Sequence, residues 1–140
     1  MQGLEQLATN IRRVFLSNGH AVERLITCLL ARGHVLIEDV PGVGKTILAT
    51  ALARSLDCTL NRIQLTPDML PSDVLGVTVW DQHKGEFIFK PGPIFANIVL
   101  ADEINRTAPR TPSALLEAMN EAQVSIDGPT QKMLEPFILI

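Results

Sequence analysis

The stretch Val35-Leu36-Ile37-Glu38-Asp39-Val40-Pro41-Gly42-Val43-Gly44-Lys45-Thr46 decides the fold of this chain. It begins as a short apolar run that predicts a buried strand, and it turns abruptly at Pro41-Gly42. From Ile47 to Leu56 the pattern becomes helical. A strand, a glycine-rich turn and a helix in this order are typical of a phosphate-binding loop. The pattern therefore predicts that residues 39–46 bind the phosphates of a nucleoside triphosphate.

Each residue type in this loop suits that chemistry. Gly42 and Gly44 lack a Cβ, so successive backbone N–H groups can converge on an anion at a helix N-terminus. Lys45 supplies a point charge for the β- and γ-phosphates, and the Thr46 hydroxyl is placed to ligate Mg²⁺. The residues that we expect to contact the nucleotide are Pro41, Gly42, Val43, Gly44, Lys45, Thr46 and Ile47.

Asp39 departs from the usual pattern G-x-x-x-x-G-K-[ST], because it occupies the first glycine position. A carboxylate aimed at the phosphates would oppose binding, so we expect Asp39 to point away from them or to meet a cation. A chance Gly-Lys-Thr turn is the alternative. It is the less favoured one, because a strand pattern and a helix pattern flank the turn correctly.

A second acidic element lies at residues 98–103, where an apolar run ends in Asp102 and Glu103. Polar residues at the C-terminal end of a buried parallel strand lie where α/β sheets bind ligands. We predict that Asp102 holds Mg²⁺, directly or through water, and that Glu103 is the catalytic base that deprotonates the attacking water. The acids alone are weak evidence, but together with the phosphate loop they are strong.

The composition describes one globular domain and excludes several classes of protein. The chain has 140 residues, of which 46% are hydrophobic and 19% are charged. A net charge of −3 gives no electrostatic reason to expect nucleic acid or an anionic membrane. Cys28 and Cys58 lie in apolar patterns without metal-binding spacing, which predicts buried reduced thiols. No apolar run reaches the ~18 residues of a membrane helix, so we expect a cytoplasmic protein.

The remaining pattern predicts alternating helices and strands. Amphipathic helices are expected over residues 4–15 and 20–32, and a strand over residues 59–65 that pairs in parallel with the first. His34 precedes the first strand and could face a bound base, although a structural polar residue at the start of a strand is commoner. The chain closes with an apolar strand after Pro136.

Two hairpins and one further helix complete the pattern. Residues 76–90 contain two β-prone runs around a five-residue loop from Asp81 to Gly85, and residues 123–134 contain a second candidate around Asp127-Gly128. Between them, Thr111 and Pro112 are typical of an N-cap and a first helical residue, which predicts a helix through about Ala122.

Four motifs together resemble the MoxR-type AAA+ ATPases. They are Gly33–Glu38 running into Pro41–Thr46, then Thr66–Asp73 (TPDMLPSD), Pro91–Asn97 (PGPIFAN) and Ala101–Arg106 (ADEINR). The similarity continues through Ala114–Glu121 and covers nearly the whole chain. The third and fourth motifs make it specific, because they are not general features of phosphate-binding loops.

This resemblance implies an α/β fold, a three-layer αβα P-loop NTPase core with a parallel sheet in the strand order 5-1-4-3-2. It makes residues 1–140 a partial AAA+ core with N-terminal helices at 4–32 and two β-hairpin inserts at 76–90 and 123–134. ATP and Mg²⁺ are the implied cofactors. The resemblance also implies a hexameric ring, chaperone-like remodelling or maturation of client complexes, and partners with von Willebrand factor A domains. It does not identify the client.

The family also has a sensor 1 residue, a fifth strand, an arginine finger and a helical lid, which would lie beyond Ile140. We therefore expect a core that is incomplete at the C-terminus, binds ATP and hydrolyses it poorly alone. Arg106 and Arg110 could contact a neighbouring subunit, but solvated loop charges are the preferred interpretation.

Two other functions stay open on the sequence. One is a regulatory subunit that senses nucleotide without turnover, which Glu103 argues against. The other is a nucleic-acid motor, for which only Lys84 and Lys132 supply basic residues near the hairpin tips. A GTPase is disfavoured, because the chain has no Asn-Lys-x-Asp motif for guanine.

Overall fold

A computed structural model of the chain describes residues 1–16, 19–38, 44–126 and 129–140. Its helices are α1 (Gln2–Val14), α2 (Gly19–Leu30), α3 (Lys45–Leu56), α4 (Pro71–Leu75) and α5 (Arg110–Glu121), with a 3₁₀ turn η1 at Ile104–Arg106. Its strands are β1 (Leu60–Gln64), β2 (Gly76–Asp81), β3 (Glu86–Pro91), β4 (Ile98–Asp102), β5 (Gln123–Ser125), β6 (Thr130–Lys132) and β7 (Ile138–Leu139).

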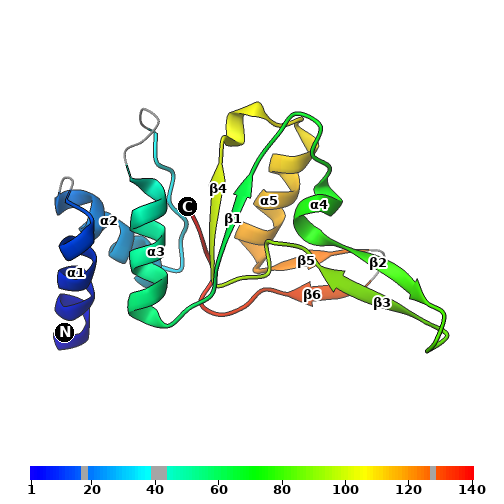
Figure 1. Ribbon diagram of the computed structural model, residues 1–140, viewed down its shortest axis with the longest axis horizontal. Helices are drawn as coiled ribbons and strands as arrows, with labels where there is room; N and C mark the ends of the chain where they lie inside the picture. The colour runs from blue at the N-terminus through cyan, green and yellow to red at the C-terminus, as the bar shows by residue number, and fades with distance from the viewer. Residues whose placement is uncertain (17–18, 39–43, 127–128) are drawn as a thin grey trace.

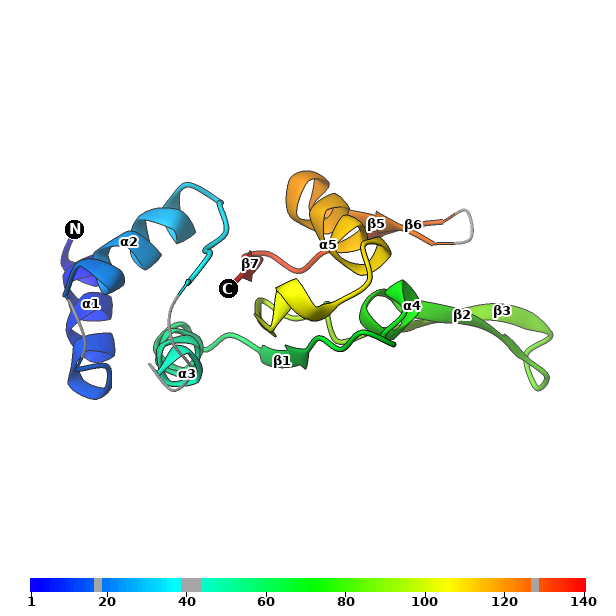
Figure 2. The ribbon, with the colours of Figure 1, turned by 90° about the horizontal axis from the view of Figure 1, so that it is seen from above.

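A parallel sheet in the order β1-β4-β7 forms the middle layer of the molecule. Helices α1, α2 and α3 lie on one side of it, and α4 and α5 lie on the other (Figures 1 and 2). The expected three-layer α/β fold with a parallel sheet is therefore confirmed.

The central strand β4 supplies side chains to both cores in turn. Ile98 and Leu100 belong to the cluster that packs against α1, α2 and α3, whereas Val99 belongs to the cluster against α4 and α5. Each of these three side chains is at most 2% exposed. A strand covered on both faces must be apolar at every position, which explains why this run lacks the polar alternation of a surface strand.

Asn97 joins the N-terminal ends of all three strands. Its side-chain oxygen accepts hydrogen bonds from the backbone N–H and the hydroxyl of Thr59, at 3.2 and 3.0 Å, just before β1. Its side-chain nitrogen donates to the carbonyl of Pro136, at 3.0 Å, just before β7. Because Ile98 follows Asn97 directly, one side chain sets the register of β1 and β7 against β4.

The expected first strand at residues 35–38 is only partly realised. The N–H of Val35 donates to the carbonyl of Leu139 at 2.9 Å, so this segment lies beside β7, but residues 33–38 form no regular strand. The arrangement of this segment, β7, β4 and β1 matches strands 1, 4, 3 and 2 of the expected order. A single backbone bond to a two-residue strand is too little pairing to make a regular ladder.

Two hairpins extend from the side of the molecule that carries α4 and α5 (Figures 1 and 2). Strands β2 and β3 pair from Gly76↔Pro91 to Asp81↔Glu86, so the loop holds four residues rather than the five expected. Trp80 and Phe87 pack edge to face near its tip, with ring centroids 5.0 Å apart. At its base, a Cβ on Gly92 would lie 2.3 Å from the carbonyl oxygen of Val74, so only glycine fits there. In the second hairpin β5 pairs with β6, and Asp127-Gly128 lie outside the described residues.

The strand expected at residues 59–65 is β1, but it pairs in parallel with β4 and not with the segment at residues 35–38.

Two other local expectations were also wrong. Thr111 does not cap α5, because the helix begins at Arg110 and the fully buried Thr111 hydroxyl instead donates to the carbonyl of Met69 at 3.0 Å. Cys28 and Cys58 are free thiols, but both are half-buried rather than fully buried. The short helix α4 was not foreseen; its signal is Asp73, whose carboxylate accepts the N–H of Leu70 at 2.8 Å.

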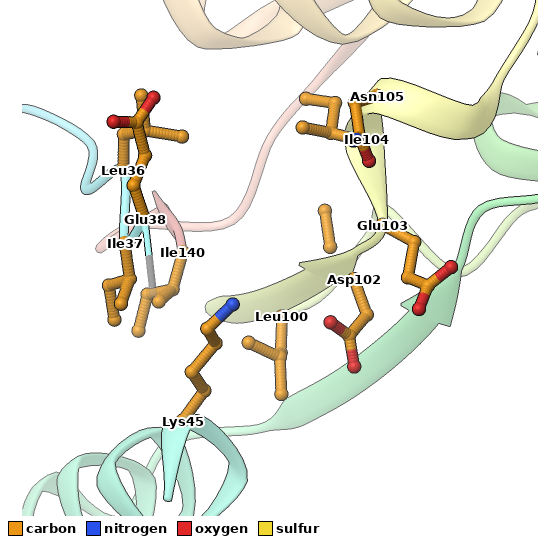
Figure 3. A pocket seen from close by; sticks show the side chains of 11 residues that line it. Leu36, Ile37, Glu38, Lys45, Leu100, Asp102, Glu103, Ile104, Asn105 and Ile140 are labelled. Carbon is orange, nitrogen blue, oxygen red and sulfur yellow. The ribbon is translucent and has the colours of Figure 1, made fainter. Parts of the chain in front are cut away.

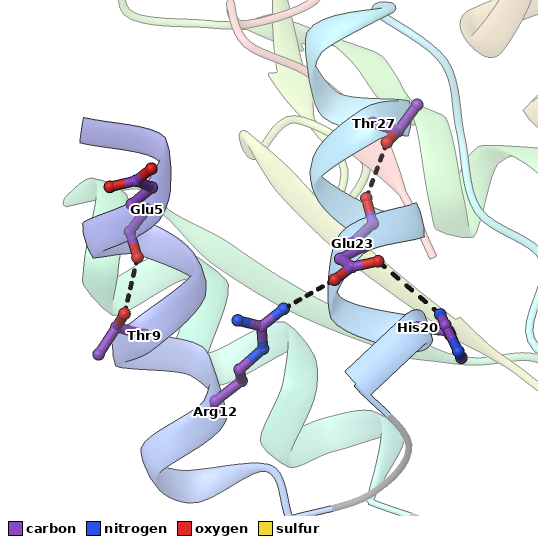
Figure 4. A network of polar contacts seen from close by, with 6 residues as sticks. All are labelled: Glu5, Thr9, Arg12, His20, Glu23 and Thr27. Carbon is purple, nitrogen blue, oxygen red and sulfur yellow. Dashed lines mark hydrogen bonds and ion pairs between the residues drawn. The ribbon is translucent and has the colours of Figure 1, made fainter. Parts of the chain in front are cut away.

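Polar contacts join α1 to α2 on the surface away from the sheet (Figure 4). Arg12 donates to a carboxylate oxygen of Glu23 at 3.1 Å, and the ring nitrogen Nδ1 of His20 lies 3.8 Å from the other oxygen. The buried side chains Leu7 and Ile11 lie on the inner face of α1. Exposed ion pairs contribute at most about 1 kcal/mol, so the apolar face of α1 is the main attachment of this helix.

His34 has a structural role at the far end of the sheet from the acidic residues of β4. Its Nδ1 accepts the N–H of Leu139 at 2.9 Å, and its Nε2 lies 3.1 Å from the carbonyl of Met119. Since Nδ1 accepts, the ring proton is on Nε2 and is donated to Met119. Burial lowers the pKa of His34, and the hydrogen bond with Met119 opposes this effect in part. His34 thus ties β7 to α5.

This geometry predicts a stability loss at mildly acidic pH. The pKa of His34 is lower in the folded chain than its ordinary value of about 6.5, so below that pH the unfolded chain takes up the proton first. The stability is complete above that value and is lost as the pH falls through the folded pKa. We expect His34→Gln to reduce the free energy of unfolding by about 1–3 kcal/mol at pH 7.5 and so to lower the melting midpoint. Between pH 7.5 and 5, the melting midpoint of His34→Gln should fall less than that of the wild type. An equal fall in the melting midpoints of the two proteins between pH 7.5 and 5 would contradict this role.

Candidate functional site

A pocket of about 340 Å³ lies between the start of α3 and the C-terminal end of β4 (Figure 3). Its charged and polar lining consists of Glu38, Lys45, Asp102, Glu103 and Asn105. Its apolar lining comes from residues 36 and 37, from β4 and η1, and from Ile140. The pocket therefore joins segments of the chain that are far apart in sequence.

Lys45 is the first residue of α3, and its half-buried side chain points into the pocket (Figure 3). Gly44 immediately before it is in the left-handed conformation, with φ 86° and ψ 23°. The N-terminus of a helix presents N–H groups and a partial positive charge. Lysine and helix terminus together make this wall of the pocket attractive to an anion.

Asp102 is the last residue of β4, and its side chain is turned toward the same space as Lys45 (Figure 3). One of its carboxylate oxygens, Oδ2, accepts a hydrogen bond from Nη2 of Arg62 at 2.8 Å. Arg62 lies on the adjacent strand β1. The Asp102 carboxylate is thus held by a side chain from β1, which flanks β4 on the other edge from β7.

Glu103 differs from Asp102 in where its carboxylate points. Its backbone is left-handed, with φ 63° and ψ 41°, which ends the strand and begins η1. Its Oε2 lies 2.7 Å from Nε of Arg106, and in Figure 3 the carboxylate points away from Lys45. A non-glycine residue in this conformation is strained, and such strain concentrates at functional sites. The ion pair between Glu103 and Arg106 joins two residues of the same loop.

The structure brings together three of the predicted site residues and separates two others. Lys45, Asp102 and Glu103 line one pocket, whereas Thr46 and Ile47 line a separate hollow between α1 and α3. Their contacts with nucleotide and metal stay predictions. Pro41, Gly42 and Val43 lie outside the described residues, as does Asp39.

Two residues of the site were missed in the sequence. Arg62 lies between Asn61 and Ile63 on β1, a strand that also carries Gln64, so its sequence context gave no signal of a contact with Asp102. Asn105 lies two residues after Glu103 in the ADEINR motif. Its position in a 3₁₀ turn rather than on the strand is a tertiary feature that no periodicity reveals.

The side chains suit a magnesium–nucleotide complex. Mg²⁺ prefers oxygen ligands and keeps several waters, so a protein commonly supplies only one or two carboxylates besides the substrate phosphates. Asp102 supplies such a carboxylate in a pocket that Lys45 also lines. Within the described ranges no group of three or more His, Cys, Asp or Glu side chains could hold a metal ion by itself. A metal here would thus be held jointly by the protein and a phosphate ligand.

Comparison with known proteins decides the family. Residues 34–140 match the model of the "ATPase family associated with various cellular activities (AAA)". The chain belongs to the AAA family of ATPases. Chaperone MoxR1 of Mycobacterium tuberculosis is 44% identical over 98% of this chain, which confirms the MoxR-type resemblance.

Two other proteins are similar to this chain. The uncharacterized protein YeaC of Bacillus subtilis is 51% identical over 98% of this chain. The crystal structure of a candidate ATPase from Cytophaga hutchinsonii superimposes with a TM-score of 0.84 at 40% identity over 99% of this chain. The chain spans 43%, 36% and 42% of the lengths of YeaC, MoxR1 and the Cytophaga protein, respectively. In the part of the chain that the structure describes, no helix is long and apolar enough to cross a bilayer.

The conformation of Gly44 gives a prediction for the start of α3. An alanine at φ 86° is strained by about 1–2 kcal/mol, so Gly44→Ala should lower the melting midpoint. Gly3→Ala is the matched control, because Gly3 is helical in α1 and a Cβ there meets nothing within 4 Å. That substitution should raise stability by up to about 1 kcal/mol. Equal effects of the two substitutions would exclude strain at Gly44.

Proposed function

We propose that this chain binds ATP with Mg²⁺ in the pocket between α3 and β4, as the nucleotide-binding part of a MoxR-type ATPase. The observation that carries the proposal is the convergence of Lys45 with Asp102 and Glu103 in one pocket. Membership in the AAA family supports it, because that is a family of ATPases.

Each side chain has a distinct task in this proposal. Lys45 and the N-terminus of α3 bind the β- and γ-phosphates, and residues 42–44 contribute backbone N–H groups. Asp102 and the Thr46 hydroxyl hold Mg²⁺, which neutralises charge that develops on the phosphates. Glu103 accepts a proton from the water that attacks the γ-phosphate. For this step the Glu103 carboxylate must leave Arg106 and turn toward the pocket.

Removal of the Lys45 charge tests nucleotide binding. A ligand that binds only the folded chain raises stability by RT ln(1 + [L]/Kd), about 2.7 kcal/mol at 100 times Kd. Lys45→Ala should abolish the increase in melting midpoint that Mg-ATP causes in the wild type. The control is Lys84→Ala, because Lys84 is exposed in the loop of the first hairpin and should leave the increase unchanged. An undiminished increase in Lys45→Ala would refute the proposed phosphate contact.

Glu103→Gln separates binding from turnover. The amide preserves the size of the side chain but cannot accept the proton of the attacking water. We expect the Mg-ATP-dependent increase in melting midpoint to persist, while phosphate release, measured in a protein of the length of the relatives, falls to the uncatalysed level. We also expect slow release from the wild-type chain, because related NTPases gain several orders of magnitude from an arginine finger. Normal phosphate release by Glu103→Gln would show that another group is the base.

One observation favours a second function, in which the chain senses nucleotide without turnover. The Glu103 carboxylate is paired with Arg106 at 2.7 Å and points away from Lys45. If this pair persists when nucleotide binds, the carboxylate cannot reach the attacking water. Binding of Mg-ATP without phosphate release, even in a protein of the length of its relatives, would favour the sensor.

We further propose that the whole protein forms a hexameric ring in the cytoplasm and remodels or matures client complexes, together with a partner that carries a von Willebrand factor A domain. The name of the MoxR1 relative, a chaperone, supports the remodelling role. Light scattering of the whole protein with and without Mg-ATP tests the ring. A monomer under both conditions would contradict it.

A further inference from the structure

Arg62 is a charged residue on β1, a strand that contributes one apolar side chain to each of the two cores. On β1, Ile63 is buried on the face that carries α4 and α5, and Leu60 packs against the cluster on the other face. Side chains alternate along a strand, so Arg62 shares the face of Leu60, on which α3 also lies. Its side chain remains 52% exposed.

The strand register explains why Arg62 reaches the acidic end of β4. Arg62 pairs with Leu100, and Gln64 pairs with Asp102. Leu100 and Asp102 are two residues apart, so both project from the same face as Arg62. The long guanidinium side chain therefore runs diagonally toward the end of the sheet and donates to Oδ2 of Asp102 at 2.8 Å. The contact joins residues 40 positions apart in the sequence.

The energy of this pair points to a role other than stability. An exposed salt bridge contributes at most about 1 kcal/mol to the free energy of unfolding. Asp102 is less exposed than Arg62, at 26% against 52% of the side chain, and it lines the pocket. Among the described residues, no other side chain shares a hydrogen bond or ion pair with Asp102. The guanidinium therefore controls the orientation of a carboxylate that would otherwise rotate.

We propose that Arg62 is a positioning residue that holds Oδ2 of Asp102 and thereby turns the other oxygen, Oδ1, toward the magnesium of the bound nucleotide. This rests on the proposed function, in which Asp102 is the protein carboxylate for that ion. Groups that orient a metal ligand typically alter metal affinity 10–100-fold when they are replaced. Arg62 acts through Asp102 and does not itself touch the nucleotide.

The test measures binding of a fluorescent ATP analogue to the 140-residue chain, once in EDTA and once over a range of Mg²⁺ concentrations. We expect Arg62→Gln to raise the Mg²⁺ concentration for half-maximal binding roughly 10-fold and to leave the affinity in EDTA unchanged. Arg62→Lys retains a charge that can reach the carboxylate but lacks the planar fork, so its effect should be smaller. Arg13→Gln, an exposed substitution on α1, is the control and should match the wild type.

A second background shows whether Arg62 acts through Asp102. In Asp102→Asn, the further change Arg62→Gln should cause no additional shift in the Mg²⁺ dependence, because residues that act together are not additive. A shift of the same size in both backgrounds would overturn the proposal. So would a wild-type Mg²⁺ dependence in Arg62→Gln accompanied by a lower melting midpoint, which would make the contact purely structural.

Other outcomes separate this inference from the proposed function. An equal loss of affinity in EDTA and in Mg²⁺ would mean that Arg62 contacts the phosphates directly, and it would overturn the positioning role alone. If the wild-type chain itself failed to bind the nucleotide under any condition, the proposed function would fail and this inference with it. Folding of every variant is checked by circular dichroism, and Arg62→Lys remains informative if Arg62→Gln does not fold.

Discussion

The side chain of Asn97 is the constraint on which the rest of the structure depends. Apolar contact alone would let these strands slide, because β7 has only two residues and the buried positions of β4, Ile98 to Leu100, are all aliphatic. Asn97 prevents this by bonding Thr59 and Pro136, the residues that lead to the two outer strands. Only one register makes these hydrogen bonds at once, and a hydrogen bond of this kind typically contributes about 0.5–1.5 kcal/mol to stability.

That register has its main consequence at the opposite end of the sheet. With Leu60 opposite Ile98, Gln64 is opposite Asp102, and Arg62 comes within reach of the Asp102 carboxylate. A slip of one residue would turn the side chains of a strand to the other face. The polar contacts at the start of the strands and the ionic contacts at their ends therefore belong to one arrangement. The site is determined by the register as much as by the residues that line it.

The general fold and the acidic pair were predictable from the sequence, because they depend on local patterns. An apolar run that ends in Asp102 and Glu103, and a glycine turn followed by the helical pattern from Lys45, are each visible within a dozen residues. The irregular segment at residues 33–38 was not predictable, since its hydrogen bonding depends on how much of β7 lies beside it. Thr111 shows the same limit. Its residue type and position are typical of a helix cap, but its buried hydroxyl donates a hydrogen bond to the carbonyl of Met69 instead.

The ion pairs of the site were also beyond the sequence, and they bear on how the pocket changes when an anion enters it. Asp102 and Glu103 are adjacent carboxylates, and each has an arginine, Arg62 and Arg106, to offset its charge. The two pairs differ in kind. Arg62 is held by a strand, so its contact with Asp102 can survive ligand binding.

Arg106 belongs to a three-residue turn that follows a strained Glu103 backbone, and its side chain is 67% exposed. Such a pair is worth at most about 1 kcal/mol, whereas a ligand at 100 times its Kd stabilises the form that it binds by about 2.7 kcal/mol. A nucleotide that binds the released form of Glu103 more tightly than the paired form by over about 1 kcal/mol, well within that total, would break the pair. Arg62 would thus keep the metal ligand oriented, whereas Arg106 would release the base.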